Sequence, residues 1–282
     1  MDIKFHCNPK ECFKNESFPI RAFLYSDYHI EPHNHGFYEI NIIFRGTGTH
    51  MVENAGFRVK PGDVFVIPPM TVHSYYECEN LDVYHILIHK NFIYKNKKES
   101  NTIPGFLQLT EIEPFLRQNF SGKAFLHLTN VQLMQLKSDL QFIEDNNQFD
   151  TDEFIALKRH ALWKILYWFS ALLYRQIYES NEKTAKKHNI AILKALEFIH
   201  QNYDEKITID LLSQVSYMSR STFQRSFFAM CKCTPMEYVN RYRCKQALDM
   251  LDTSSSSKTE IAHCCGFYDL SHMERTIRHF ER

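Results

Sequence analysis

The sequence predicts two domains of different fold class: an N-terminal antiparallel β-barrel or jelly roll and a C-terminal all-α domain with two helix-turn-helix units. Three observations support this prediction. Up to about residue 90, short β-branched and aromatic segments alternate with turn residues. From about residue 130, apolar residues recur at helical spacing. Residues 208–228 and 257–280 then repeat one pattern: a short helix, a tight turn and a second helix.

Length and composition allow two hydrophobic cores. The chain has 282 residues, of which 44% are apolar. Its formal net charge is zero, but residues 1–185 carry a net charge of about −3 and residues 186–282 about +3. This mild basic bias is far from a histone-like composition. It is compatible with a DNA-binding protein whose specificity depends on base contacts.

The eight cysteines show no disulfide-framework spacing, and the sequence has neither a signal peptide nor a long apolar run. We therefore expect reduced thiols in a cytoplasmic protein that has no membrane partner. Cys231-x-Cys233 and the Cys264-Cys265 pair lack zinc spacing. We interpret these four residues as core or half-buried thiols.

Residues 1–125 are predicted to form the barrel. The segments Glu39–Phe44, Asp63–Ile67 and Val83–Ile88 have the composition of strands, and Gly and Pro residues punctuate the sequence between them. Several short strands with turn residues between them are typical of a small antiparallel barrel.

Residues 126–178 are predicted to be a helical dimerisation segment. Val131, Met134, Leu140 and Ile143 mark one helix. The second helix has apolar residues at spacings of three to five: Leu157, Ala161, Ile165, Trp168, Leu172 and Ile177. Because this helix is apolar over much of its girth, we expect one face on the barrel and another on a partner subunit in a homodimer. A purely intramolecular core is the alternative. The polar residues 179–188 are predicted to be the interdomain linker.

Residues 189–282 are predicted to form the helix-turn-helix domain, which begins with a helix from about Asn189 to Tyr203. Thr208 is suited to cap the first short helix, and Ser219 and Asp269 are suited to cap the second helix of each unit.

Thr234, Pro235 and Glu237 form a strong helix start between the two units. Nothing breaks the run that follows before about Leu251. A helix of some 17 residues would span about 25 Å. Such a rod can hold two recognition helices in successive major grooves, which lie about 34 Å apart.

The second helix of each unit offers polar side chains to DNA. Phe223 and Phe227 lie four apart and are expected to be buried, which leaves the opposite face exposed. Gln and Arg on such a face suit adenine and guanine edges, and Glu274 suits a cytosine amine. Ordinary solvated residues are the alternative. The residues expected to contact DNA are Arg220, Ser221, Gln224 and Arg225 in the first unit and Ser271, His272, Glu274 and Arg275 in the second.

The stretches SRSTFQRSF, TPMEYVNRYRCKQALDML and EIAHCCGFYDLSHMERT resemble the arabinose-operon-regulator (AraC/XylS) family over essentially the whole last third of the chain. The resemblance implies double-stranded promoter DNA and RNA polymerase as partners. Three features depart from the family pattern. Lys258 stands where an apolar residue is usual, and Met273 replaces an aromatic residue. The sequence also ends at Arg282, where the family continues through a Gly-x-x-Pro segment, so we expect the last helix to be less supported.

His33-x-His35-x-x-x-Glu39 and Gly62-x5-Pro68-x4-His73 resemble the two motifs of the cupin barrel, with Met70 in place of a usual Gly. His33, His35 and Glu39 share one face of an extended strand, and His73 would join them from another strand. Three imidazoles and one carboxylate suit a divalent metal such as Fe, Mn, Ni or Zn. We favour the alternative, a cluster with no cofactor that forms hydrogen bonds or contacts a ligand directly.

The resemblance also implies a small effector inside the barrel, most often a sugar or a related metabolite. Aromatic faces combined with hydrogen-bonding groups suit a carbohydrate, although core filling is the alternative for each aromatic residue. The expected effector-binding residues are His33, His35, Tyr38, Glu39, Arg45 and His73. The further aromatic residues expected near them are Phe37, Phe44, Phe65, Tyr75 and Tyr76.

We therefore predict a regulator, not an enzyme, that binds promoter DNA and responds to a small molecule. Effector binding would change the population of subunit arrangements that can engage two half-sites. Two alternatives remain: a regulator whose barrel is only a scaffold for dimerisation, and a metal-dependent cupin enzyme fused to a DNA-binding domain. The identity of the effector, the operator sequence and the direction of regulation do not follow from the sequence.

Overall fold

The computed structural model describes residues 3–8, 12–13, 20–96, 100, 103–117, 126–149, 151–178 and 185–280. The chain divides into two compact units, Met1–Ser180 and Asn181–Arg282. In the described part of the chain, no helix combines the length and the apolar character that a membrane span requires.

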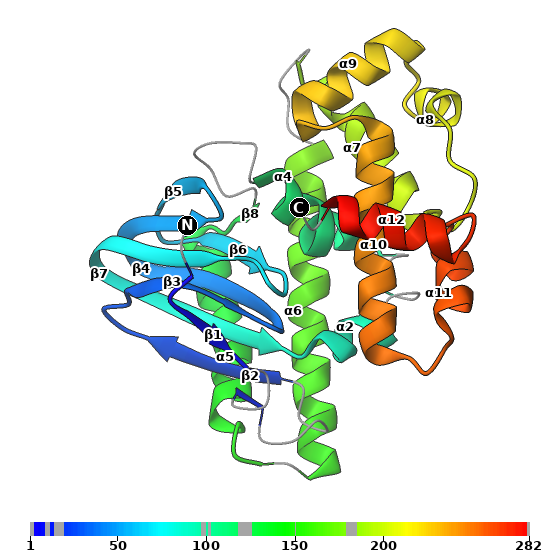
Figure 1. Ribbon diagram of the computed structural model, residues 1–282. Coiled ribbons are helices and arrows are strands. Elements are labelled where there is room, and N and C mark those ends of the chain that lie inside the picture. Colours follow the sequence, from blue (N-terminus) through cyan, green and yellow to red (C-terminus); the bar gives the residue numbers. More distant parts are fainter. Residues whose placement is uncertain are drawn as a thin grey trace. The chain divides into compact units, whose positions relative to one another are not determined.

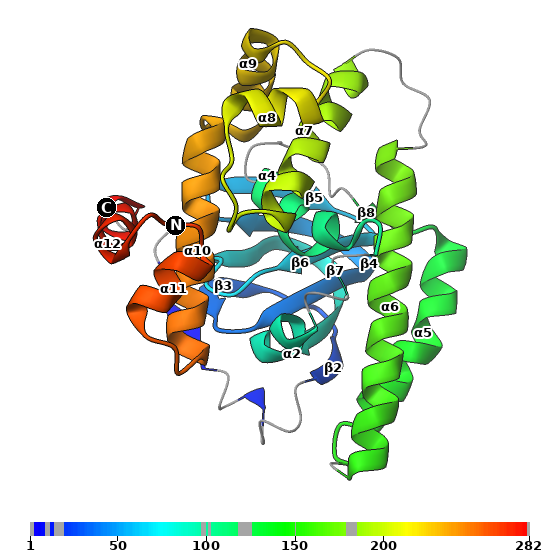
Figure 2. The same cartoon turned by 90° about the vertical axis from the view of Figure 1, so that its right-hand side faces the viewer.

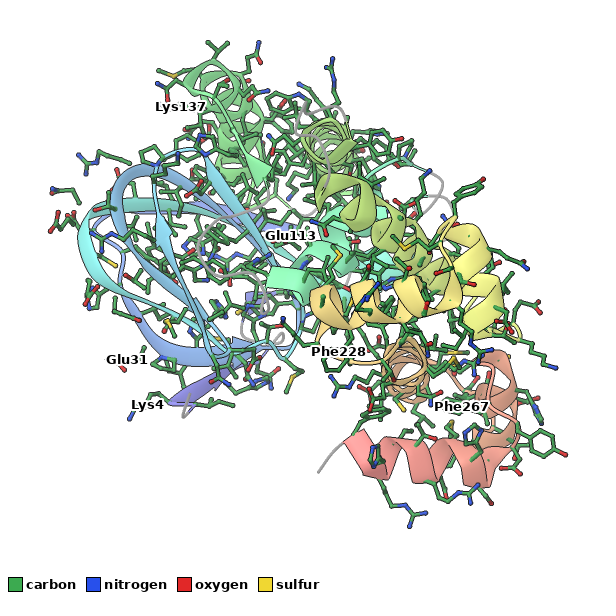
Figure 3. The ribbon with its side chains drawn as sticks, turned by 90° about the horizontal axis from the view of Figure 1, so that it is seen from above. Lys4, Glu31, Glu113, Lys137, Phe228 and Phe267 are labelled. Carbon is green, nitrogen blue, oxygen red and sulfur yellow. The ribbon has the colours of Figure 1, made fainter. Side chains whose placement is uncertain are left out.

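The described part of the N-terminal unit is built on an eight-stranded sheet that curves around a shared interior (Figures 1 and 3). The strand order is β1-β3-β7-β4-β6-β8, with β2 paired to β7 and β5 paired to β4. The strands are β1 (Phe5–Cys7), β2 (Ile20–Tyr25), β3 (Ile30–His35), β4 (Tyr38–Val52), β5 (Ala55–Val59), β6 (Asp63–Ile67), β7 (His73–Ile88) and β8 (Leu126–His127).

The predicted strands are present, but two of them are much longer than predicted. Strand β6 has the predicted bounds, whereas β4 runs for 15 residues and β7 for 16. Gly46 does not end β4 as expected, because the β4–β7 pairing shifts register on either side of Arg45 and the strand continues. Gly46 has a φ of +78°, and a Cβ there would lie 2.2 Å from the Asn80 carbonyl oxygen. The glycine thus permits a bend inside the strand.

The two faces of β4 contribute to two different cores, one outside the barrel and one inside it. Tyr38, Ile40 and Ile42 belong to the hydrophobic core between the sheet and the helices. Ile43 belongs to a second core inside the barrel, and Glu39 shares its parity on the strand. The alternation therefore places polar chemistry on the inner face and apolar packing on the outer face.

The outer face of the sheet is covered by helices α5 (Asn130–Asp145) and α6 (Asp152–Tyr178), which lie side by side (Figure 2). Thr129 and Gln132 form a capping box at the start of α5. Shorter helical segments join the sheet to this layer: α2 (Lys90–Lys95), a π-helical turn (Gln108–Ile112) and α4 (Glu113–Arg117).

Helix α6 contributes heavily to the intramolecular core, through Leu162, Phe169 and Leu173 among others. Tyr167 and Tyr174 lie seven residues apart on the same face of the helix and are 37% and 36% exposed. Contact of this second face with a partner subunit stays a prediction.

The C-terminal unit consists of six helices in its described part (Figure 1). The first helix begins at Ala185 and ends at Gln201, and so differs from the predicted Asn189–Tyr203. Residues 185–188 therefore belong to a helix and not to the predicted linker, whose residues 179–184 lie outside the described residues. The helices are α7 (Ala185–Gln201), α8 (Ile209–Val215), α9 (Arg220–Cys231), α10 (Pro235–Thr253), α11 (Lys258–Cys264) and α12 (Leu270–Phe280).

None of the eight cysteines, all of which lie among the described residues, forms a disulfide. Cys231, Cys233 and Cys265 are buried, as expected for core thiols. Cys264 is exposed, because it occupies the solvent-facing side of α11, so its prediction as a core or half-buried residue was wrong.

Candidate functional site

The first helix-turn-helix unit is formed by α8 and α9. The predicted caps are confirmed: the Thr208 side chain accepts a hydrogen bond from the Leu211 amide at 3.2 Å, and the Ser219 hydroxyl accepts one from the Thr222 amide at 3.3 Å. Phe223 and Phe227 are fully buried, which fixes the opposite face of α9 toward solvent.

The exposed face of α9 carries Ser221, Gln224 and Arg225. Phe228, labelled in Figure 3, is 54% exposed near the end of the same helix. Arg220 is also exposed, but its guanidinium lies 3.3 Å from Asp210, so it is partly held within the unit. Three of the four predicted residues in this unit therefore project from α9 without such a tether.

The second unit, formed by α11 and α12, has the same construction. Ser257 and Glu260 form a capping box on α11, and Asp269 accepts a hydrogen bond from the His272 amide at 2.7 Å, as predicted for its capping role. Met273 is buried, and Ile277 and Phe280 pack against the same core.

Ser271, Glu274 and Arg275 are exposed on α12 at the spacing of Ser221, Gln224 and Arg225 on α9. His272 is different, because it is half-buried and its ring packs edge-on against Phe267 at 5.4 Å. The His272 Nδ1 also accepts a hydrogen bond from the Tyr268 amide at 3.4 Å. His272 thus stabilises the turn, whereas the other three side chains face solvent.

Helix α10 joins the two helix-turn-helix units within the C-terminal domain. Its Arg243 is buried and donates hydrogen bonds of 2.7 Å to the carbonyl oxygens of Tyr203 and Glu205. Its 19 residues span about 28 Å at 1.5 Å per residue. Gly266 packs against this junction with a φ of +75°, and a Cβ there would lie 2.6 Å from the Tyr203 carbonyl oxygen. The two exposed helix faces are thereby held at a fixed separation.

The barrel interior of the N-terminal unit contains a buried carboxylate surrounded by imidazoles. Glu39 Oε2 lies 2.9 Å from His35 Nε2 and 3.0 Å from His73 Nε2, and Glu39 Oε1 lies 2.6 Å from His85 Nδ1. Burial alone would raise the pKa of Glu39, but these three hydrogen bonds outweigh it and hold the pKa well below its ordinary value. Glu39 is therefore a buried anion.

Two histidines of this interior, His33 and His50, have lowered pKa values. Burial, followed by the nearby His73, lowers the pKa of His33 to about 4. Burial also lowers the pKa of His50 well below its ordinary value. Neither ring nitrogen of His50 has a hydrogen-bond partner among the described residues, and its ring stacks on Tyr75 with centroids 4.2 Å apart.

The structure brings together all four predicted metal-site residues, but it does not place them equivalently. His33, Glu39 and His73 each offer an atom within 4.8 Å of the others. His35 lies outside this group, with its Nδ1 2.8 Å from the Phe37 carbonyl oxygen and its Nε2 at Glu39. Two imidazoles and one carboxylate are a donor set that suits a divalent transition metal.

Two predicted effector-binding residues lie elsewhere. Tyr38 faces the helical layer, where its hydroxyl donates a hydrogen bond of 3.2 Å to Glu111, because its parity on β4 is opposite to that of Glu39. The Arg45 side chain is 62% exposed and lies 2.8 Å from Asp82, because the register shift in β4 turns it outward. Neither residue joins the histidine cluster, and a role for either in effector binding stays a prediction.

The aromatic residues that were expected near the effector also divide between the barrel interior and the outside of the sheet. Phe65 and Tyr75 line the barrel interior, and Phe37 stacks on His35 at 4.3 Å. Phe44 packs on the outer core, and Tyr76 is 42% exposed.

Sequence reasoning missed His85, His50 and Asn41. Within the predicted strand Val83–Ile88, alternation could have placed His85 on the inner face. Asn41 shares the parity of Glu39 and donates to the Tyr75 hydroxyl at 3.3 Å. His50 gave no such signal, because it lies beyond the predicted end of β4.

A hollow of about 730 Å³ opens beside the first half of β7, from Ser74 to Leu81. Its lining includes Tyr75, which links it to the buried cluster, and three carboxylates, those of Asp27, Glu31 and Glu77. Among the described parts of the N-terminal unit, this hollow is a candidate place for a small ligand.

Comparison with known proteins supports the assignment of both domains. Residues 20–128 match the AraC-like ligand binding domain, and residues 212–282 match a helix-turn-helix domain. The transcriptional activator RhaS of Pectobacterium carotovorum is 26% identical over 248 residues, covering 87% of this chain and 82% of that protein. RhaS of Escherichia coli O139:H28 is 26% identical over 253 residues, with the same coverage.

One solved structure is similar to the last third of the chain, and another is similar to most of it. The DNA-binding domain of AdpA in complex with a target DNA is 27% identical, with a TM-score of 0.31, over 32% of this chain and 80% of that one. ToxT from Vibrio cholerae O395 is 12% identical, with a TM-score of 0.38, over 92% of this chain and 93% of that one. With a ligand-binding domain followed by a helix-turn-helix domain, the chain belongs to the AraC family of effector-responsive, DNA-binding transcription regulators.

Proposed function

We propose that the protein reads two elements of promoter DNA through Ser221, Gln224 and Arg225 on α9 and Ser271, Glu274 and Arg275 on α12. The observation that carries this proposal is the repetition of one exposed pattern, Ser-x-x-Gln/Glu-Arg, on two capped helices of one packed domain. The α10 rod supports the same proposal, because its length suits two helices in neighbouring turns of the major groove.

Each side chain has a chemical counterpart in the major groove. Gln224 matches the donor and acceptor of adenine, and Arg225 matches the two acceptors of guanine. Glu274 accepts a hydrogen bond from a cytosine amine, and Arg275 contacts a guanine or an adjoining phosphate. The two helices therefore prefer different sequences, and the operator has two unlike elements.

Selection of duplexes from a random pool by the full chain, at moderate salt, tests this function. The expected result is a motif with two elements about one helical turn, or 10 base pairs, apart. A motif with one short element contradicts a role for α12. Salt-sensitive binding without a motif contradicts sequence-specific reading by either helix.

The N-terminal unit senses a small polar molecule, of which a carbohydrate is the expected class. The hollow beside Tyr75 supports this assignment because it combines an aromatic floor with carboxylates, which accept hydrogen bonds from hydroxyl groups. A thermal-shift screen of sugars tests it: a ligand at a hundred times its Kd should stabilise the protein by about 2.7 kcal/mol. A screen in which no sugar shifts the transition or the DNA affinity favours a barrel that serves only as a scaffold.

The histidine–glutamate cluster acts as a hydrogen-bonded wall with no resident cofactor. The three hydrogen bonds to Glu39 support this assignment, because they already satisfy its carboxylate. If a divalent ion were bound, His33, Glu39 and His73 would hold it. A metal-dependent enzyme would need such an ion, whereas the curated relatives carry the names of transcriptional activators.

The protein works as a homodimer in the cytoplasm and acts on RNA polymerase. The exposed tyrosine face of α6 supports self-association, and the names of the curated relatives support action on transcription initiation. Sedimentation tests the first part: Tyr167→Glu should convert a dimer into a monomer. A wild-type monomer at micromolar concentration contradicts it.

A further inference from the structure

The turn of the first helix-turn-helix unit contains a tyrosine in an unfavourable position. Tyr217 directly follows Ser216, the C-cap of α8, and has a φ of +52°. At the same place in the second unit, Gly266 directly follows Cys265, the C-cap of α11, with a φ of +75°. Glycine is the usual residue at this left-handed position, because a Cβ there is strained.

Packing does not compensate for this strain. The Tyr217 residue is 89% exposed, so its ring buries little apolar surface. A strained, exposed aromatic residue next to a recognition helix points to a function, because backbone strain persists where a site needs it.

A cation lies beside this ring. The Lys194 Nζ of α7 is 5.9 Å from the centre of the Tyr217 ring. Together they border a hollow of about 400 Å³ between α7, the turn and the start of α9. The lining also contains the hydroxyl residues Ser216, Ser219 and Thr222 and the apolar residues Ile190, Ala191 and Met218. Among the described residues, no carboxylate lines it. The hollow therefore suits an anion that accepts hydrogen bonds.

We propose that Lys194 and Tyr217 seat a backbone phosphate of the DNA element read by α9. This inference rests on the proposed function. Tyr217 lies three residues before Arg220, the first residue of α9, whose Gln224 and Arg225 face the base edges in that proposal. Lys194 supplies the charge and the Tyr217 hydroxyl donates a hydrogen bond, so the seat fixes the register of α9 on the duplex without reading a base.

The test measures affinity for the selected duplex as a function of salt in the full chain. Lys194→Ala should weaken binding about tenfold and make the slope of log K against log salt shallower by about 0.9, the value for one lost phosphate contact. The same loss should occur on a scrambled duplex, because the contact carries no sequence information. Lys206→Ala, which removes an exposed lysine beyond the other end of α7, is the matched control and should leave the slope unchanged.

Tyrosine variants separate this role from a structural one. Tyr217→Phe should weaken binding severalfold with the slope unchanged, because only the hydroxyl is lost. Tyr217→Gly should weaken binding at least as much while the melting temperature stays equal or rises, because the left-handed strain is relieved. A purely structural role predicts that affinity and melting temperature fall together.

Three results would overturn the seat: unchanged binding by Tyr217→Gly, equal slopes for Lys194→Ala and Lys206→Ala, or loss of binding on the selected duplex alone. Inorganic phosphate at constant ionic strength should not raise the melting temperature of the wild type. A rise that Lys194→Ala abolishes would assign the hollow to a free anion instead. Failure of the wild type itself to select any duplex motif would contradict the proposed function, whereas wild-type binding with unaffected variants would contradict the seat alone.

Discussion

Substitution of Gly266 by alanine should destabilise the helix-turn-helix domain strongly. The left-handed conformation costs a non-glycine residue about 1–2 kcal/mol. The new Cβ would also lie 2.6 Å from the Tyr203 carbonyl oxygen and 2.9 Å from that of Asp204. Displacing the Tyr203 carbonyl would weaken its 2.7 Å hydrogen bond with the Arg243 guanidinium, which is worth about 1.5–3 kcal/mol. The expected total is about 2.5–5 kcal/mol.

The chain offers two probes that separate this loss from effects on the N-terminal unit. The sequence has two tryptophans, Trp163 and Trp168, and both lie in α6 of the N-terminal unit. In urea titrations, tryptophan fluorescence therefore reports that unit, whereas far-ultraviolet circular dichroism reports the helices of both units. Gly266→Ala should shift the dichroism transition to lower urea and leave the fluorescence transition in place.

Gly56→Ala is the matched control. Its Cβ would meet the flexible end of the Met51 side chain, at 2.9 Å, and its φ is not left-handed. We expect it to cost less than about 1 kcal/mol, by fluorescence. A Gly266→Ala loss below about 0.5 kcal/mol, the usual effect of a surface substitution, would refute the steric reasoning. A parallel shift of both probes would refute the assignment to one unit.

Three further outcomes are expected. Arg225→Ala should lose about 1–3 kcal/mol of affinity at one base pair, measured on single-base duplex variants, whereas Arg220→Ala, tethered to Asp210, should lose far less; equal losses would contradict the geometry. The N-terminal unit should lose up to about 3 kcal/mol between pH 6.5 and 4, because His33 stays neutral when folded and takes up a proton when unfolded. Below about pH 4.5 Glu39 should add to the loss, because the unfolded chain takes up a proton at Glu39 while the folded protein keeps it anionic; stability that is flat from pH 6.5 to 4 would contradict this account. Protein purified anaerobically should hold well below one equivalent of divalent metal by elemental analysis, and stoichiometric metal lost in Glu39→Gln would reverse the assignment of a metal-free wall.

Local chemistry explains what the sequence could predict. A helix cap is a bond between residues three apart, so Thr208, Ser219, Thr234 and Asp269 identified their helices from sequence alone. The parity of His33, His35 and Glu39 likewise required only the geometry of one strand.

The remaining features depend on contacts between distant segments. Arg45 turns outward because β4 shifts register against β7, which depends on a partner strand nearly forty residues away. His85 reaches Glu39 from that same partner strand, and His50 lies in an extension of β4 that Gly46 bends instead of ending. Tyr38 was predictable in principle, because its parity is opposite to that of Glu39.

The measurement that tests the central claim most directly repeats the duplex selection with Gln224→Glu and Glu274→Gln. Each variant exchanges one amide and one carboxylate on an exposed face, with little change in shape. The account predicts that Gln224→Glu alters a base only in the element read by α9, and that Glu274→Gln alters one only in the other element. Changes in both elements from either variant, or in neither, would contradict two independent recognition helices.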